Sequence, residues 1–139
     1  MGLMLDTSVL ISSERGRFNL EDFIEKEAPM EDVFISSISA SELLHGVHRA
    51  VLAARSKREM FVEAVLRETP ILPFDLPCAR RHAELWAALE ASGKRIGAHD
   101  MLIAATGLRF GLRLATLNEK EFSSVEGLTL ANVHPYIQS

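Results

Sequence analysis

The sequence predicts a single α/β domain built around a mainly parallel sheet. Short, continuously apolar runs such as residues 3–5 and 33–35 are typical of strands that are buried on both faces. Longer segments between such runs carry apolar residues at every third or fourth position, which is the spacing of amphipathic helices. Strands that alternate with helices in this way favour parallel pairing through right-handed crossovers. A length of 139 residues fits one domain over residues 1–139.

The first half of the chain is expected to hold two strands and four helices. The i, i+3, i+4 spacing of Leu20, Phe23 and Ile24 predicts a short helix there. The apolar face of the fourth helix is expected to include Met60 and Phe61. The predicted strands are residues 3–5 and 33–35. The first predicted helix begins at residue 9, and the other three lie near residues 20–24, 40–54 and 57–68. The stripe predicted for the 40–54 helix comprises Leu43, Leu44, Val47, Val51 and Leu52.

The second half is expected to continue the alternation. A third strand is predicted over Ile71–Phe74, and Pro73 places it at an edge or a bulge because proline cannot donate to a ladder. Asp75 and Pro77 then open a helix that runs to about residue 92 and ends at Gly93. Its inward residues are expected to be Ala79, His82, Ala83, Trp86 and Leu89. The remaining predicted elements are a helix over 98–110, a strand over 114–116, a short helix with Phe122 and a last edge strand over 128–130.

Composition excludes several classes of protein. The formal net charge of −4, from 15 basic and 19 acidic residues, disfavours a simple electrostatic nucleic-acid binder. Hydrophobic residues make up 47% of the chain, which argues against disorder. The single cysteine, Cys78, rules out an internal disulfide and suggests a reducing compartment. No apolar run approaches the length of about 20 residues that a membrane span needs, so the cytoplasm is the expected location.

Three acids stand where such a fold places its functional residues, near the carboxyl ends of the strands. Asp6 ends the first strand, Glu42 lies in the helix after the second, and Asp100 opens the helix before the fourth. Each is followed closely by apolar residues, so each is expected at the polar lip of a buried element. Carboxylates brought together repel one another, and a divalent cation relieves that repulsion. Hard oxygen ligands without cysteine or paired histidine select Mg²⁺ or Mn²⁺ over Zn²⁺.

Each acid also has a structural interpretation that the sequence leaves open. Ser39 and Glu42 have the S-x-x-E spacing of a capping box, in which Glu42 would only satisfy a backbone N–H. Asp100 could complement a helix dipole, and Asp6 could be an N-cap. His99 either orients a ligand beside Asp100 or lies in solvent. The capping pattern recurs at Ser56-Lys57-Arg58-Glu59 and, with asparagine, at Asn118-Glu119-Lys120-Glu121.

Four segments of the chain, in this order and at these separations, resemble the PIN-domain proteins, specifically the VapC-type toxin ribonucleases. They are Leu3-Met4-Leu5-Asp6-Thr7-Ser8-Val9-Leu10-Ile11, Ile38-Ser39-Ala40-Ser41-Glu42-Leu43, His99-Asp100-Met101-Leu102-Ile103-Ala104-Ala105-Thr106 and Ala115-Thr116-Leu117-Asn118-Glu119-Lys120-Glu121-Phe122. The resemblance runs over nearly the whole chain. It implies a three-layer α/β/α sandwich and Mg²⁺- or Mn²⁺-dependent cleavage of RNA. It also implies a homodimer and a VapB-type antitoxin partner.

The resemblance further implies a set of site residues. Asp6, Glu42 and Asp100 would ligate the metal ion, and Ser8 and Thr116 would be supporting polar residues. Asn118 departs from the family pattern, because many relatives have aspartate there. Its amide oxygen can coordinate a metal but carries no charge, so Glu121 is a candidate for the missing carboxylate. The expected phosphate contacts, each also interpretable as an ordinary surface charge, are Arg15, Arg17, Lys94 and Arg95.

Three other functions compete with this one. Asn118 motivates a PIN fold that is catalytically weakened and only binds RNA. A metal-dependent phosphohydrolase would usually carry a second aspartate two residues after the first, where this chain has Ser8. A receiver-like signalling module would need an acceptor aspartate after a central strand, whereas the only candidate, Asp75, precedes Pro77 at an edge strand.

Overall fold

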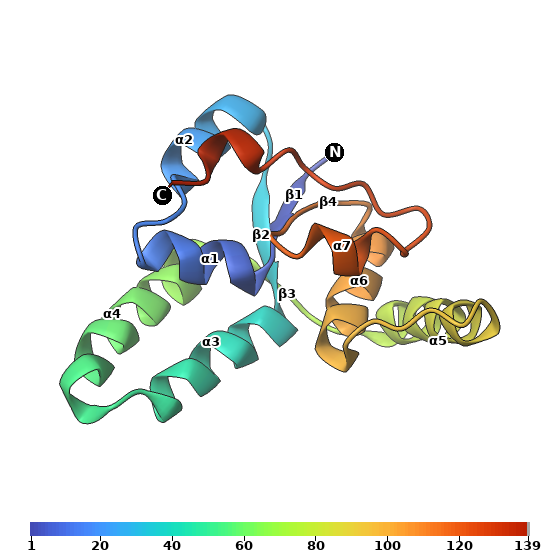
Figure 1. The fold of residues 1–139 in the computed structure, drawn as a ribbon, viewed down its shortest axis with the longest axis horizontal. Coiled ribbons are helices and arrows are strands. Elements are labelled where there is room, and N and C mark those ends of the chain that lie inside the picture. The colour runs from blue at the N-terminus through green and yellow to red at the C-terminus, as the bar shows by residue number, and fades with distance from the viewer. Residues whose placement is uncertain (139) are drawn as a thin grey trace.

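A computed structural model describes residues 1–138 and shows four strands in one parallel sheet (Figure 1). The strand order is β3-β2-β1-β4, and each neighbouring pair is parallel. The chain therefore steps outward from β1 to β3 and then crosses back to place β4 on the other side of β1. This reversal creates a topological switch point between β1 and β4. The strands are β1 (Leu3–Leu5), β2 (Val33–Ser36), β3 (Ile71–Leu72) and β4 (Arg113–Ala115).

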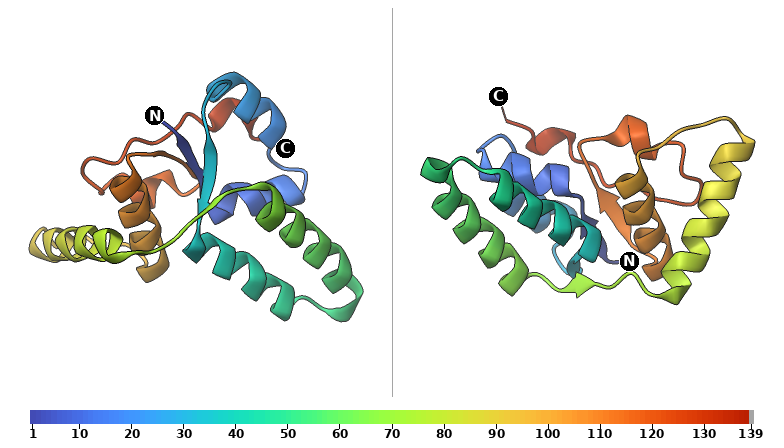
Figure 2. Two further views of the ribbon diagram at one scale, coloured as in Figure 1. Left: turned by 180° about the vertical axis from the view of Figure 1, so that it is seen from behind. Right: turned by 90° about the horizontal axis from the view of Figure 1, so that it is seen from below.

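The helices cover both faces of this sheet and confirm the three-layer α/β/α architecture (Figures 1 and 2). On one side lie α1 (Thr7–Glu14), α2 (Leu20–Glu27), α3 (Ser37–Arg49) and α4 (Leu52–Glu68). On the other side lie α5 (Leu76–Ala91), α6 (Ala98–Phe110) and α7 (Glu119–Phe122). A 3₁₀ turn, η1 (His134–Tyr136), packs beside α2 near the end of the chain. No helix within residues 1–138 is long and apolar enough to cross a membrane.

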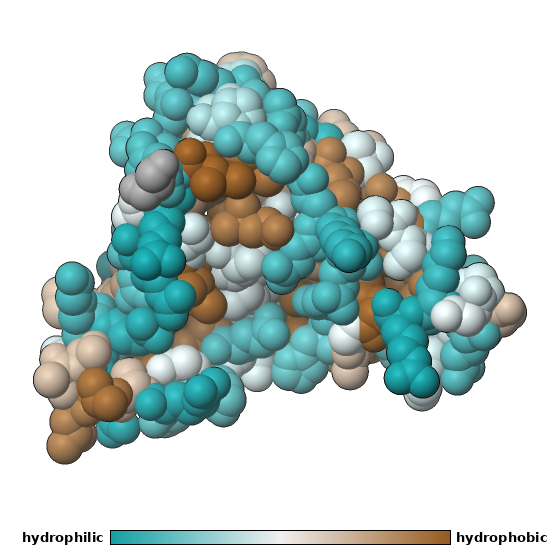
Figure 3. Space-filling model, viewed as in Figure 1, coloured by the Kyte–Doolittle hydropathy of each residue, from teal (hydrophilic) through white to brown (hydrophobic). Residues whose placement is uncertain are grey.

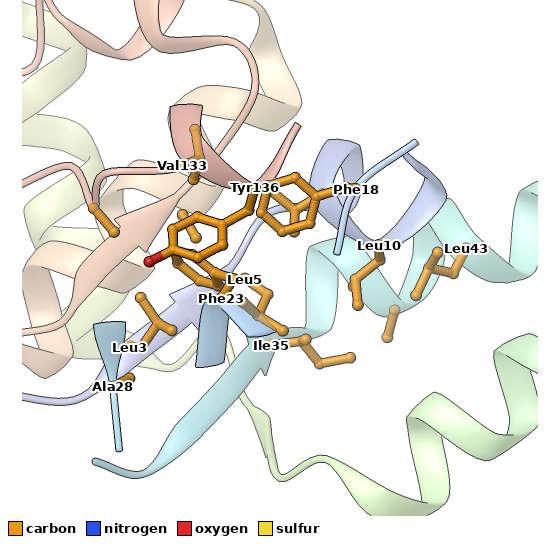
Figure 4. Close-up of a cluster of buried hydrophobic side chains, with 14 of the residues drawn as sticks. Leu3, Leu5, Leu10, Phe18, Phe23, Ala28, Ile35, Leu43, Val133 and Tyr136 are labelled. Atoms are coloured by element: carbon orange, nitrogen blue, oxygen red, sulfur yellow. The ribbon is translucent and has the colours of Figure 1, made fainter. Parts of the chain in front are cut away.

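The side chains of β1 divide the interior into two cores, because successive residues of a strand point to opposite faces. Leu3 and Leu5 belong to the core beneath α1–α4, and Met4 belongs to the core beneath α5 and α6. Figure 4 shows the first core, where Phe23 packs between Phe18 and Tyr136 with ring centroids 5.5 and 5.3 Å away. All three β1 residues are buried, which confirms the prediction of a strand enclosed on both faces.

The boundary between α3 and α4 differs from the sequence prediction. Residues 40–54 were expected to form one helix, but α3 begins at Ser37 and ends at Arg49. Ala50 and Val51 are extended, and the Arg55 guanidinium donates hydrogen bonds to the carbonyls of His48 and Ala50. Arg55 thereby satisfies carbonyl groups at the end of α3 and fixes the turn. Ser56 consequently lies inside α4, so the capping box predicted there is wrong.

The predicted apolar faces of α3, α4 and α5 are each wrong in part. Leu43 and Val47 are buried in α3 as predicted, but Leu44 is exposed. Val51 and Leu52 are 72% and 83% exposed, because they stand at the corner between α3 and α4, Val51 as the N-cap of α4 and Leu52 as its first residue. Figure 3 shows an apolar patch at this corner. Met60 is likewise exposed. On α5 the buried residues are Cys78, Leu85 and Leu89, whereas Ala83 and Trp86 are exposed. This helix is rich in alanine, so its apolar pattern fits several faces and does not identify the one that packs.

The last predicted strand, residues 128–130, does not form. Leu130 makes only an isolated parallel bridge with Leu114 in β4. The segment therefore lies at the predicted edge of the sheet but pairs there for a single residue. Thr129 accepts from the Leu114 N–H and Ala131 donates to the Leu114 carbonyl, after which the chain leaves for η1.

Candidate active site

The site begins at Asp6, the residue that directly follows β1 and caps α1. Its backbone N–H donates to the carbonyl of Ala115 at the end of β4, over 2.9 Å. This hydrogen bond joins the carboxyl ends of two neighbouring parallel strands at the switch point, where α/β proteins place their ligands. The Asp6 side chain is almost completely removed from solvent, with the residue 2% exposed.

Two hydroxyl groups hold the buried Asp6 carboxylate. Its Oδ2 accepts one hydrogen bond from Ser8 Oγ and one from Thr116 Oγ1, each at 2.7 Å. The same hydroxyl oxygens accept backbone N–H groups, Ser8 from Leu117 and Thr116 from Asn118, both at 3.0 Å. Because each hydroxyl already accepts a backbone proton, its own proton is aimed at Asp6. The structure thus brings together Asp6, Ser8 and Thr116, as the resemblance implied.

Glu42 reaches the site from α3 and does not form a capping box. The N-cap of α3 is Ser36, whose Oγ accepts from the Ser39 N–H at 3.0 Å. Glu42 therefore lies one turn beyond the position from which a glutamate accepts the backbone N–H of the N-cap residue. Its Oε1 instead accepts a hydrogen bond from Thr7 Oγ1 at 2.6 Å. Its Oε2 lies 3.3 Å from His99 Nδ1. The capping interpretation of Glu42 is therefore wrong.

Asp100 and Glu121 meet around Gly97, the residue that caps α6. The Gly97 N–H donates to Glu121 Oε1 at 2.9 Å. A Cβ atom at position 97 would lie 3.6 Å from Glu121 Oε1 and 3.8 Å from Asp100 Oδ2. The two carboxylates therefore flank the same small residue. Asn118 is the N-cap of α7 but makes no side-chain hydrogen bond to the helix, so the capping box predicted at Asn118 does not form either.

The charges of neighbouring acids act on Asp100 and on Asp6. Burial and, after it, the charges of Asp6, Glu121 and Glu42 together raise the pKa of Asp100 to about 6, while His99 opposes them. Burial also raises the pKa of Asp6, against the hydrogen bonds from Ser8 and Thr116, and the Glu42 charge adds to the increase. Such mutual repulsion requires the four carboxylates to lie near one another. A cluster with raised pKa values at a switch point is a candidate functional site.

The donor chemistry of this cluster fits a hard divalent cation. Every candidate ligand is an oxygen, from a carboxylate or from the Asn118 amide, which suits Mg²⁺ and Mn²⁺, and positive charge would relieve the repulsion among the carboxylates. Within residues 1–138, however, no three Asp, Glu, His or Cys side chains are already arranged so that they could hold a metal ion. The acids converge on one region from different elements and would have to draw closer to share an ion.

The four predicted phosphate contacts are not equally placed. Lys94 and Arg95 are exposed in the loop that leads into α6, a few residues before Asp100. Arg15 and Arg17 follow the far end of α1, whose eight residues separate them from Asp6 by about 12 Å. Lys94 and Arg95 are therefore close to Asp100 in the chain, whereas Arg15 and Arg17 lie a whole helix away from Asp6.

Sequence reasoning missed Thr7 as part of this cluster. The threonine stands between Asp6 and Ser8, and the only signal was its place in the first turn of a helix beside a candidate ligand. Gly97 was missed as well, although a glycine shortly before Asp100 could have indicated a close approach.

Comparisons with known proteins agree with this fold. The PIN domain family model matches residues 3–128. Ribonuclease VapC1 of Rickettsia felis is 37% identical over 134 residues, which cover 96% of this chain and 97% of that protein. Ribonuclease VapC of Rickettsia bellii is 32% identical over 136 residues, with coverage of 96% and 97%.

A solved structure shows the same architecture. VapBC2 from Rickettsia felis, bound to a DNA fragment from their promoter, contains a chain that superposes with a TM-score of 0.86 at 28% identity. The superposition covers 94% of this chain and 97% of that one. The chain therefore belongs to the PIN-domain family and, within it, to the VapC ribonuclease toxins of VapBC toxin–antitoxin systems. Membership of this family sets aside the receiver-like and phosphohydrolase interpretations.

We predict that Asp100→Asn stabilises the metal-free protein at pH 8, because it removes a carboxylate whose charge is disfavoured by burial and by the repulsion of its neighbours. Since the folded state raises the pKa of Asp100 to about 6, it binds this proton more tightly than the unfolded state does. The stability contributed by protonation is complete below about pH 4 and is lost as the pH rises through about 6. The urea midpoint of the variant should exceed that of the wild type at pH 8, and the two should converge at pH 4.

The matched control for this experiment is Glu90→Gln, which neutralises an exposed acid on α5. Its urea midpoint should follow that of the wild type at every pH. If the urea midpoint of Asp100→Asn also followed that of the wild type from pH 4 to pH 8, the Asp100 carboxylate would not be destabilised in the folded protein.

Proposed function

We propose that the acidic cluster is the active site of an endoribonuclease that depends on Mg²⁺ or Mn²⁺ and acts as the toxin of a VapBC-type module. The observation that carries this proposal is the convergence of Asp6, Glu42, Asp100 and Glu121 on the switch point, where the charges of the others raise the pKa of Asp100. Proteins of this family are typically metal-dependent. The relatives named ribonucleases supply the substrate class, which is RNA.

The proposed division of labour follows from the contacts of each residue. Asp6, Glu42 and Asp100 would hold the ion, while Ser8 and Thr116 fix the Asp6 carboxylate by their hydrogen bonds to Oδ2. When bound, the ion would lower the pKa of a coordinated water and offset charge on the phosphate. A carboxylate that is not engaged by the ion would orient the attacking water. Lys94 and Arg95 would contact the phosphates of a flexible, unpaired RNA strand.

Glu121 favours an active enzyme over a weakened PIN fold that only binds RNA. Asn118 lacks the charge of the aspartate that many relatives carry, but Glu121 flanks Gly97 together with Asp100. Its carboxylate is held there by the Gly97 N–H. We therefore assign the fourth acidic position to Glu121 and treat Asn118 as an uncharged neighbour, able to coordinate through its amide oxygen.

We predict that the purified protein cleaves total cellular RNA with Mg²⁺ or Mn²⁺ and that Asp6→Asn abolishes cleavage. The amide keeps the shape of the buried side chain but removes the charge that the ion would need. Cleavage is measured by mapping the new RNA ends, with a parallel reaction in EDTA. Undiminished cleavage in EDTA, or by Asp6→Asn, would refute the proposed mechanism.

The control is Asp32→Asn, which removes an exposed aspartate just before β2, at the amino end of that strand and away from the carboxyl ends that carry the cluster. It should cleave RNA as the wild type does. A thermal melt of each variant establishes that the loss in Asp6→Asn is not a loss of folding.

An apolar groove on the α1–α4 side is the proposed seat of the VapB-type antitoxin. It has a volume of about 500 Å³ and lies between α2 and α4. Its walls are the apolar residues Leu5, Leu10, Leu20, Ile24, Val33, Phe61, Ala64 and Val65, with Glu68 and Thr69 at one end. An amphipathic helix lays its apolar face into a groove of this kind. Solved VapBC complexes in this family support an antitoxin as the partner.

We predict that Ala64→Arg weakens binding of the antitoxin by about 10- to 100-fold, because a buried charge would face the apolar side of the partner. Complex formation is measured by co-purification and by titration of nuclease inhibition. The control, Ala54→Arg, places the same charge on an exposed position of α4. If the antitoxin inhibited both variants equally, this groove would be excluded as the antitoxin-binding site. Without antitoxin, both variants should cleave RNA as the wild type does.

Two further expectations complete the proposal. A homodimer is supported by large apolar side chains that stay exposed in one copy, namely Val51, Leu52, Met60 and Trp86. A cytoplasmic location is supported by the proposed RNA substrate and by the free thiol of Cys78.

A further inference from the structure

Glu42 is the one acid of the cluster that two side chains from other helices hold, one at each carboxylate oxygen. Thr7 of α1 donates to Oε1 at 2.6 Å, and His99 of α6 lies 3.3 Å from Oε2. The two contacts differ in burial. Thr7 is 8% exposed, whereas the His99 side chain is 62% exposed. The buried contact is also the shorter one, so Thr7 sets the orientation of the Glu42 carboxylate and His99 lies on its open side.

The backbone around Thr7 is fixed by the same turn that places Asp6. The Asp6 N–H is bonded to Ala115, and the Asp6 carbonyl accepts from the N–H groups of Val9 and Leu10. Thr7 is the first residue of α1, so its hydroxyl has little freedom to move away from Glu42. Two successive side chains then serve two acids, because Thr7 binds Glu42 and Ser8 binds Asp6. One helical turn thereby orients an acid that follows β1 and an acid that belongs to α3.

We propose that Thr7 is a positioning residue of the cation site, whose hydroxyl aims the Glu42 carboxylate at the same region as Asp6. This inference rests on the proposed function, because it assigns a role in holding the ion. Residues that hydrogen-bond to a metal ligand fix its direction, and replacing one typically lowers metal affinity or activity about 10- to 100-fold.

A purely structural role for this hydroxyl is disfavoured by the other contacts between the same helices. Val9 and Leu10 of α1 share a buried cluster with Leu43 and Val47 of α3. Arg58 of α4 also binds Glu14 of α1, with Nε 3.0 Å from Oε1. These contacts hold α1 in place without the hydroxyl. Removing the hydroxyl should therefore change the direction of Glu42 more than the packing of the helices.

We predict that Thr7→Val weakens Mn²⁺ binding by about 10-fold, as measured by isothermal titration calorimetry of the RNA-free protein. Valine keeps the branched shape and removes only the donor. Thr7→Ser, which keeps the hydroxyl, should restore most of the affinity. RNA cleavage by Thr7→Val should be lost at limiting Mn²⁺ and recover at high Mn²⁺, a dependence that a merely structural defect would not produce.

The matched control is Thr106→Val, which removes a buried threonine hydroxyl of α6 that donates to the backbone carbonyl of Leu102 at 2.8 Å. It should leave Mn²⁺ affinity unchanged. In the double variant with Glu42→Gln, Thr7→Val should cause no further loss, because residues that act as a unit are non-additive. Wild-type affinity in Thr7→Val, or a full additional loss in the double variant, would overturn the inference.

These measurements distinguish a failure of the proposed function from a failure of the role proposed for Thr7. If the wild type neither binds Mn²⁺ nor cleaves RNA, the proposed function fails and the role of Thr7 fails with it. If the wild type does both and Thr7→Val matches it, only the role of Thr7 fails.

Discussion

The buried carboxylate of Asp6 is the constraint on which the rest of the site depends. An ionised group with so little exposure is costly to desolvate, and it persists because two hydroxyls donate to it and a strand end fixes its backbone. Those donors come from Ser8 in α1 and Thr116 after β4. The hydrogen bonds can form only if β1 and β4 are neighbours, in parallel and in register. The sheet topology and the acidic site are therefore two aspects of one arrangement.

The arrangement concentrates negative charge at one place in the fold. Asp6, Glu42, Asp100 and Glu121 together equal the formal net charge of −4, so the rest of the chain is formally neutral. The acidity of the protein is consequently no evidence against an RNA substrate, because a bound divalent cation would offset much of it. The neutral remainder does not predict strong electrostatic steering of RNA. The repulsion that costs stability without a cation is what would give the site its affinity for one.

Much of this could be predicted from the sequence, because buried parallel strands and their polar ends have strong local signals. The four strands, the edge position of β3 and the end of α6 at Gly111, where φ is +66°, follow from apolar runs, Pro73 and a single glycine. The position of Asp6 follows from the first strand alone. These features depend on contacts within a few residues, so one sequence is enough to show them.

The remaining features depend on contacts that are distant in the chain. Glu42 fits a capping box by spacing, and its contacts with Thr7 and His99, which are 35 and 57 residues away in the chain, show that it faces the site instead. Arg55 ends α3 by binding carbonyls that precede it, which no helix propensity foretells. The packed face of α5 depends on which partner helix covers it. In each case a side chain can contact either residues nearby in the chain or residues distant from it, and the sequence alone does not show which contact forms.

If Asp6, Glu42, Asp100 and Glu121 form one cation site, a crystal structure of the protein with bound Mn²⁺ will show the ion among them. The anomalous signal of manganese should give a peak between Asp6 and Asp100, with the Glu42 carboxylate turned toward it and still bonded to Thr7. The carboxylates should lie closer together than in the metal-free fold. A protein that cleaves RNA with Mn²⁺ yet shows no peak at this edge of the sheet, or a peak elsewhere, would contradict the account.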